Sequence, residues 1–161
     1  MMTILIVLVA ILSVVGSVAW VRPSKRDVKL ATWRQAARVA GLQVKLEALK
    51  AEPKDSGIRE DVGLASYFLY LPKAQKNDEM TWAVVKAEGW LKAHLPSGWS
   101  WYRREVALNT NKLQALIESC PVPIHAIERT PNGSRIVWDE AGQDFEAHKL
   151  VEFLTQVQAI S

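Results

Sequence analysis

This 161-residue chain contains few cysteines and histidines, one and three respectively, and its eight glycines are dispersed. The single Cys120 cannot form an intramolecular disulfide, which suits a reducing compartment. A structural zinc site needs about four ligands at close spacing, and neither Cys-x-x-Cys nor His-x-x-x-His occurs. No glycine-rich phosphate loop is present. We therefore predict no metal, no cofactor and no catalytic residue, and we expect that the protein is not an enzyme.

Charged residues are absent from Met2 to Val21, and the basic segment Arg22-Pro23-Ser24-Lys25-Arg26 comes directly after. At about 1.5 Å per residue, this run is long enough to cross a hydrocarbon core of roughly 30 Å. Basic residues after such a run favour a cytoplasmic location for the C-terminal part of the chain. We expect a single-pass protein of the bacterial inner membrane, with its N-terminus outside and its C-terminal domain in the cytoplasm.

A cleaved secretory signal is the alternative, because Ser17-Val18-Ala19 has the small-x-small pattern of a cleavage site. Signal peptides carry a basic segment before an apolar run of roughly 7–15 residues. This chain has no basic residue there and its apolar run is longer, so the anchor is the favoured interpretation.

The segment Trp20-Val21-Arg22-Pro23-Ser24-Lys25-Arg26 resembles the small accessory subunit of the bacterial Sec preprotein translocase. That family has a single span, which runs into Arg-Pro-Gln and then into Lys and Arg; here Ser24 replaces the Gln. The resemblance covers roughly the first 35 residues and implies an accessory role in a transport complex. The chain is also loosely similar to single-span inner-membrane proteins of Gram-negative bacteria.

Basic charge is concentrated directly after this run. Residues 22–50 contain eight basic residues against Asp27 and Glu47, whereas residues 51–161 contain twelve basic and fifteen acidic residues. Each basic residue near an anionic leaflet contributes about 1 kcal/mol of attraction. We predict a collar that contacts lipid headgroups, formed by Arg22, Lys25, Arg26 and Lys29. The mildly acidic remainder argues against a nucleic-acid partner.

Hydrophobic periodicity predicts an α+β fold with a transmembrane helix at residues 1–21, a basic helix at 22–41 and a cytoplasmic domain at 42–161. Alternating or β-branched residues predict strands at 42–46, 64–71 and 81–86. Pro131-Asn132-Gly133 predicts a tight hairpin between residues 122–130 and 134–139. Helices are expected at about 110–120 and 144–160. We expect an antiparallel sheet of about five strands packed by two or three helices, with a mobile loop at 50–63.

The segment Trp90–Arg104 is rich in aromatic and basic residues and contains no acid. Trp, Tyr and Arg dominate the energetics of protein interfaces. Two interpretations stay open, a contact surface or core packing of one side of a strand. The candidate interface residues are Trp90, Trp99, Trp101, Tyr102, Arg103 and Arg104.

Cys120 and His125 form a possible nucleophile pair, with Asp139 as a possible orienting residue. Cys120 shares an apolar helix face with Leu113 and Leu116, however, which favours a buried structural thiol. Carboxylate pairs occur at Glu60-Asp61, Asp78-Glu79 and Asp139-Glu140. They fall in expected turns or strand ends, where solvated carboxylates keep similar pKa values and do not divide acid and base roles.

These observations support three hypotheses of function. The leading hypothesis is a non-enzymatic, membrane-tethered domain that binds a protein partner or acts as a scaffold. The alternative is an accessory subunit of a preprotein translocase or another transport complex, in which the span makes the contact. The third is a membrane-tethered enzyme that uses Cys120, His125 or a carboxylate pair.

Overall fold

The computed structural model describes residues 2–20, 23–71, 81–104, 108–142 and 144–160. The chain divides into two compact units, Met1–Thr32 and Trp33–Ser161, with the boundary inside helix α2 (Lys25–Val39). The first unit contains α1 (Met2–Trp20) and the start of α2. Ser24 and Asp27 cap α2 reciprocally, since the Ser24 Oγ accepts from the Asp27 N–H at 3.1 Å and the Asp27 Oδ2 accepts from the Ser24 N–H at 3.1 Å.

The predicted transmembrane anchor is wrong, because none of the helices in the described ranges is long and apolar enough to cross a membrane. The helix α1 ends at Trp20 and contains 19 residues. The predicted single-pass location in the inner membrane, with the N-terminus outside, fails with the anchor. The helix itself lies where the sequence placed it, since α1 spans Met2–Trp20 and the predicted segment was 1–21.

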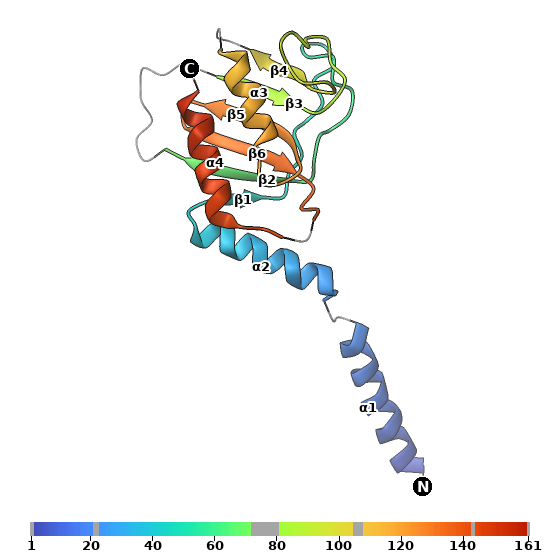
Figure 1. The fold of residues 1–161 in the computed structure, drawn as a ribbon. Coiled ribbons are helices and arrows are strands. Elements are labelled where there is room, and N and C mark those ends of the chain that lie inside the picture. Colours follow the sequence, from blue (N-terminus) through green and yellow to red (C-terminus); the bar gives the residue numbers. More distant parts are fainter. Residues whose placement is uncertain (1, 21–22, 72–80, 105–107, 143, 161) are drawn as a thin grey trace. The chain divides into compact units, whose positions relative to one another are not determined.

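The second unit contains a six-stranded sheet in which every neighbouring pair is antiparallel, in the order β1-β2-β6-β5-β3-β4 (Figure 1). The strands are β1 (Gln43–Lys45), β2 (Ala65–Tyr70), β3 (Trp82–Val85), β4 (Ser100–Arg104), β5 (Ile124–Thr130) and β6 (Gly133–Trp138). The sequence predicted about five strands. The additional strand is β4. From the sequence, its residues suited either a contact surface or a strand in the core.

Helices α3 (Thr110–Glu118) and α4 (Ala147–Ala159) lie against one face of this sheet (Figure 1). Asn109 caps α3 by accepting from the Lys112 N–H at 3.2 Å, as its sequence position predicts. The Ser134 hydroxyl of β6 donates to the Leu154 carbonyl of α4 at 2.8 Å. Because side chains alternate along a strand, the even-numbered residues of β6 face the helices. The principal core between these layers consists of Trp82, Val84, Ile127, Ile136, Leu113, Leu150, Phe153, Leu154 and Val157, all buried.

The opposite face of the sheet is covered in part by the segment 49–62. Leu49, Ile58 and Val62 are buried in a second cluster with Ala83, Val85, Tyr102, Ala126 and Val137. The segment is held by paired backbone hydrogen bonds between Leu49 and Val62, each 2.9 Å long. The prediction of a mobile surface loop here was wrong, because a few apolar residues between polar turns are enough to fasten the segment to the sheet.

The β5–β6 hairpin is confirmed, with Pro131 and Asn132 as its two-residue loop. Gly133 has a φ of +148°, and a Cβ atom there would collide with the Leu69 carbonyl oxygen of β2. Glycine is therefore required twice at this position, for the backbone conformation and for the approach of β2.

A buried ion pair and an aromatic cluster join the second half of α2 to the end of β6. The Glu140 carboxylate, 4% exposed, forms a bidentate pair with the Arg34 guanidinium and accepts from the Tyr67 hydroxyl at 2.7 Å. Around this pair, the rings of Trp33, Tyr67, Trp138 and Phe145 have neighbouring centroids 5.6–6.0 Å apart. Burial and the hydrogen bond to Glu140 raise the pKa of Tyr67, which keeps its hydroxyl protonated.

Candidate functional site

A surface cavity of about 660 Å³ lies between residues 57–63 and residues 86–90 and also contacts His125 and Asp139. We call it the Trp90 groove. The groove forms because segment 49–62 packs on the sheet while the chain after β3 turns back beside it. Two hydrogen bonds hold this turn, from the Gly89 N–H to the Ser100 Oγ and from the Trp90 N–H to the Ser56 carbonyl, both 2.9 Å long.

Trp90 stands at the edge of the groove with 67% of its surface exposed. Its indole ring packs directly on Gly57, where φ is +79° and a Cβ atom would collide with the ring. The ring is thus supported on one side by backbone and open to solvent on the other. The described tryptophans that are buried instead are Trp33, Trp82, Trp99, Trp101 and Trp138.

The groove also contains a histidine–carboxylate pair, as the sequence suggested for His125 and Asp139. A bulge in β5 between Ile124 and Ala126 moves His125 out of the strand register. Its Nε2 lies 2.7 Å from the Asp139 Oδ2, and both side chains are partly exposed. Such a pair can orient an imidazole toward a ligand or act as a base.

Cys120 does not complete this pair as a nucleophile. The half-buried thiol has its pKa raised to about 12 by burial, so it stays protonated at neutral pH. A cysteine nucleophile reacts as the thiolate and needs a lowered pKa. The raised pKa of Cys120 therefore argues against a cysteine nucleophile beside His125 and Asp139.

Acidic side chains predominate around the groove: Glu60, Asp61, Glu88 and Asp139 line it against the cations of Arg59 and Lys86. The Asp61 carboxylate accepts from the Lys50 Nζ at 2.9 Å and from the Ala51 N–H at 2.8 Å, and these bonds hold its pKa below the usual range. The lining contains four carboxylates and two cations, and Lys50 and Lys92 from outside the lining pair with Asp61 and Glu88.

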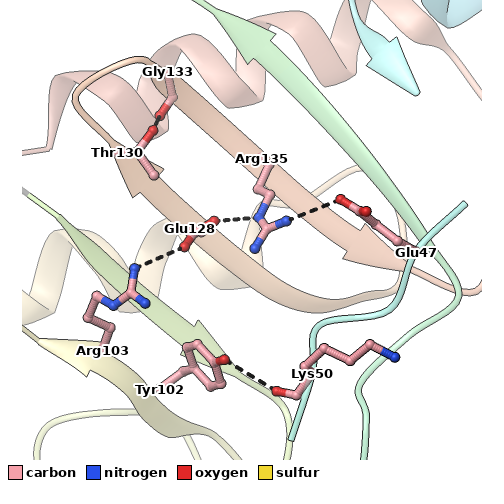
Figure 2. A network of polar contacts seen from close by, with 8 residues as sticks. All are labelled: Glu47, Lys50, Tyr102, Arg103, Glu128, Thr130, Gly133 and Arg135. Carbon is pink, nitrogen blue, oxygen red and sulfur yellow. Dashed lines mark hydrogen bonds and ion pairs between the residues drawn. The ribbon is translucent and has the colours of Figure 1, made fainter. Parts of the chain in front are cut away.

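A second candidate site lies on the part of the sheet that segment 49–62 leaves uncovered, which we call the open face. Figure 2 shows its polar network, with Arg135 of β6 between Glu128 of β5 and Glu47. The Arg135 Nε pairs with the Glu128 carboxylate, and its Nη1 lies 4.0 Å from the Glu47 Oε1. Arg103 of β4 reaches the other Glu128 oxygen at 3.7 Å. Glu128 is only 8% exposed, so two guanidinium groups offset the cost of burying its charge.

Next to this network the open face has a cavity of about 270 Å³. Phe68 and Tyr70 line it with their ring centroids 4.1 Å apart, and the Tyr70 hydroxyl donates to the Gln43 amide oxygen at 2.8 Å. Ser66 lines the same cavity; it is 3% exposed, and its buried hydroxyl has no hydrogen-bond partner in the part of the chain that the structure describes.

The structure separates the residues that the sequence grouped in Trp90–Arg104. Trp99, Trp101 and Tyr102 are buried; the Trp101 Nε1 donates to the Ala93 carbonyl at 3.1 Å. The Tyr102 hydroxyl donates to the Lys50 carbonyl at 3.2 Å and fastens segment 49–62 (Figure 2). Arg104 lies over the Trp101 ring, 5.1 Å from its centroid, and Arg103 joins the open-face network. Of the six candidates, Trp90 alone is exposed as an aromatic contact.

The predicted basic collar falls largely in the first unit. Lys25 and Arg26 are exposed and Lys29 is half-buried, all on the first two turns of α2, while Arg22 lies outside the described residues. The carboxylate pair Asp78-Glu79 also lies outside them. Over the ranges that the structure describes, no three His, Cys, Asp or Glu side chains are placed to hold a metal ion.

No protein-family model, curated protein or solved structure matches this chain. The resemblance of its first 35 residues to the translocase accessory subunit therefore stays a prediction from sequence. The geometry of the Trp90 groove is the remaining guide to function.

Sequence reasoning missed the open face altogether. Glu128 and Arg135 face each other across the β5–β6 hairpin, and Ser66 and Phe68 come from a strand much earlier in the chain. The alternation of Ser66, Phe68 and Tyr70 on one side of β2 was the available pattern, since residues two apart share a sheet face. This alternation indicated which residues share one face of β2, but not which side chains of the neighbouring strands lie beside them.

Proposed function

We propose that the unit from Trp33 onward is a non-enzymatic protein-interaction domain, and that it binds a partner segment with basic side chains in the Trp90 groove. The observation that carries the proposal is the exposed Trp90, held on Gly57 at the edge of a cavity of about 660 Å³. A rigidly supported, exposed tryptophan is the type of residue that dominates binding energy in protein interfaces.

The charge of the groove supports a basic partner segment. Its lining has an excess of carboxylates, of which Glu60 and Glu88 are exposed and Glu88 pairs with Lys92. Complementary charge mainly accelerates association and selects the partner, while the buried aromatic contact provides affinity. Arginine and lysine also bind favourably over the face of a tryptophan ring. The protonated thiol of Cys120 supports binding rather than cysteine-based chemistry at this end of the sheet.

Selection from a library of random peptides, each about 12 residues long, on the full chain tests this proposal, followed by anisotropy titrations of the enriched peptides. We expect enrichment of Lys- and Arg-containing sequences, with binding that weakens as salt rises. Trp90→Ala is expected to raise Kd about 30-fold, which corresponds to about 2 kcal/mol for a central aromatic contact. Glu60→Lys, a charge reversal in the groove, is expected to raise Kd about tenfold.

Val39→Ala is the matched control, because Val39 is an exposed apolar residue on α2 and does not line the groove. It is expected to leave Kd unchanged. Melting temperatures of all variants show that the fold is retained. Equal binding by Trp90→Ala and the unmodified chain, or enrichment of acidic peptides, contradicts the proposal.

A further inference from the structure

We propose that the cavity of the open face is a second binding site, and that it takes a carboxylate group carried next to an aromatic ring. The site does not depend on the Trp90 groove, since none of the residues that line one cavity lines the other. Four features carry the inference: an unpaired hydroxyl, available cationic donors, an aromatic wall and the size of the cavity.

The hydroxyl is that of Ser66, which is buried without a partner among the described residues although Ser66 lines the cavity. A buried polar group without a hydrogen bond destabilises the folded state, so it is retained where another role requires it. A serine hydroxyl rotates freely about its bond to Cβ and donates one hydrogen bond. An acceptor atom in the cavity satisfies it.

Cationic donors come from Arg135 and Lys45. The Arg135 guanidinium lies within ion-pair distance of Glu128 through its Nε and 4.0 Å from Glu47 through its Nη1, and its buried Nε–H has no hydrogen-bond partner of normal geometry among the described residues. Guanidinium N–H groups bind carboxylates in pairs, with a geometry that neutral acceptors do not match. Lys45 is exposed beside Ser66 on the neighbouring strand.

The charges on this surface favour an anion. The cavity lining carries two positive charges, Lys45 and Arg135, and two negative ones, Glu47 and Glu128. Arg103 of β4 lies outside the lining and adds a third positive charge through its ion pair with Glu128. Because the Glu128 carboxylate is already contacted by both guanidinium groups, its remaining capacity to attract a cation is small (Figure 2). The Lys45 ammonium and the Ser66 hydroxyl of the lining are the donors that remain for an anion such as a carboxylate.

The aromatic wall and the volume define the rest of the ligand. Phe68 and Tyr70 present neighbouring rings to the cavity, and aromatic rings prefer offset or edge contacts with a further ring. A volume of about 270 Å³ is slightly below the usual range of pockets for drug-sized ligands, about 300–1,000 Å³. It accommodates a single ring with its carboxylate. The source is either a free aromatic acid or the C-terminal aromatic residue of a peptide.

Titrations of the full chain with phenylacetate, followed by amide chemical shifts, test the site. We expect saturable binding with a Kd of about 1 mM or tighter, as is typical for a ligand of this size. Phenylacetamide, which lacks the negative charge, and cyclohexylacetate, which lacks the flat ring, are each expected to bind about tenfold more weakly. N-acetylphenylalanine distinguishes the sources: tighter binding than phenylacetate indicates a peptide terminus, and weaker binding indicates a free acid.

Two serine variants separate a binding role from a structural one. Ser66→Ala is expected to weaken phenylacetate binding about fivefold while the melting temperature stays equal or rises, because an unpaired buried hydroxyl is removed. Ser134→Ala makes the same change on the opposite face, where the hydroxyl is bonded to Leu154. It is expected to lower the melting temperature and leave affinity unchanged. Tyr70→Leu, at an exposed position, is expected to weaken binding without unfolding the protein.

Absence of saturable binding by both phenylacetate and N-acetylphenylalanine overturns the proposal. Equal affinity for phenylacetamide also overturns it, because the charge then has no role. The same conclusion holds if Ser66→Ala and Tyr70→Leu both bind as tightly as the unmodified chain.

Discussion

Glu140 provides the most direct test of how the second unit is held together. It has a φ of +52°, a conformation that costs a residue with a side chain about 1 kcal/mol. The contacts of the side chain offset this cost, because the Glu140 carboxylate is bound by the Arg34 guanidinium and the Tyr67 hydroxyl. The Glu140 side chain is only 4% exposed. We therefore expect Glu140→Gln to keep the strained backbone and lose most of the ionic interaction.

The magnitude depends on the burial of the two partners. Removal of one partner from a fully buried ion pair costs about 3–5 kcal/mol. The Arg34 side chain is 23% exposed, so water can solvate part of its charge, and the glutamine oxygen retains one hydrogen bond. We expect Glu140→Gln and Arg34→Gln each to lower the free energy of unfolding by about 2–3 kcal/mol. The double variant is expected to cost at least about 1.5 kcal/mol less than the two single changes together, because two glutamines can pair.

Urea unfolding followed by tryptophan fluorescence measures these values, since Trp33 and Trp138 lie in the adjoining aromatic cluster. Unchanged m-values show that the compactness of both states is preserved. Arg38→Gln, at an exposed position four residues from Arg34, is the control and is expected to change stability by less than about 0.5 kcal/mol. A coupling below about 0.5 kcal/mol between the two positions refutes the argument that this pair joins α2 to the sheet.

Two further predictions concern a turn and the thiol. Gly133→Ala is expected to lower the free energy of unfolding by about 2–4 kcal/mol, because both the positive φ and the Leu69 carbonyl oppose a Cβ atom. Gly98→Ala, with positive φ but open space, should cost only about 1 kcal/mol, and equal costs in urea unfolding contradict the steric argument. For Cys120, a thiol pKa of about 12 leaves roughly one thousandth as thiolate at pH 9. Iodoacetamide labelling of the folded chain should therefore accelerate about tenfold per pH unit between about pH 8 and pH 11, and a plateau near pH 9 shows instead an ordinary exposed thiol.

Local chemistry made the second unit largely predictable. The hairpin was predicted from Pro131-Asn132-Gly133, and α3 was predicted from the Asn109 cap and its apolar stripe. In both places a few adjacent residues determine the backbone, because turn residues and caps act within one turn of chain. The strand β4 was harder to predict, since Trp99 and Trp101 suit a core strand and an interface equally well.

The candidate sites could not be predicted in the same way, because each combines residues from distant parts of the chain. His125 and Asp139 were named together, but their place in the Trp90 groove depends on a β-bulge and on the packing of segment 49–62. Composition alone also failed at the N-terminus, where a charge-free run predicted an anchor and the described helices include none suited to cross a membrane.

The sequence by itself determined the helix caps, the hairpin turn and the alternation of the strands, since these depend on interactions between residues close along the chain. Only the tertiary structure decided the strand order, and with it which residues are buried. Strand order placed Glu128, Arg135 and Ser66 on one face, and it left Trp90 exposed while Trp101 became core. The physical reason is that burial and ion pairing depend on which strands become neighbours, and the favourable free energy of those contacts appears only when the sheet is complete.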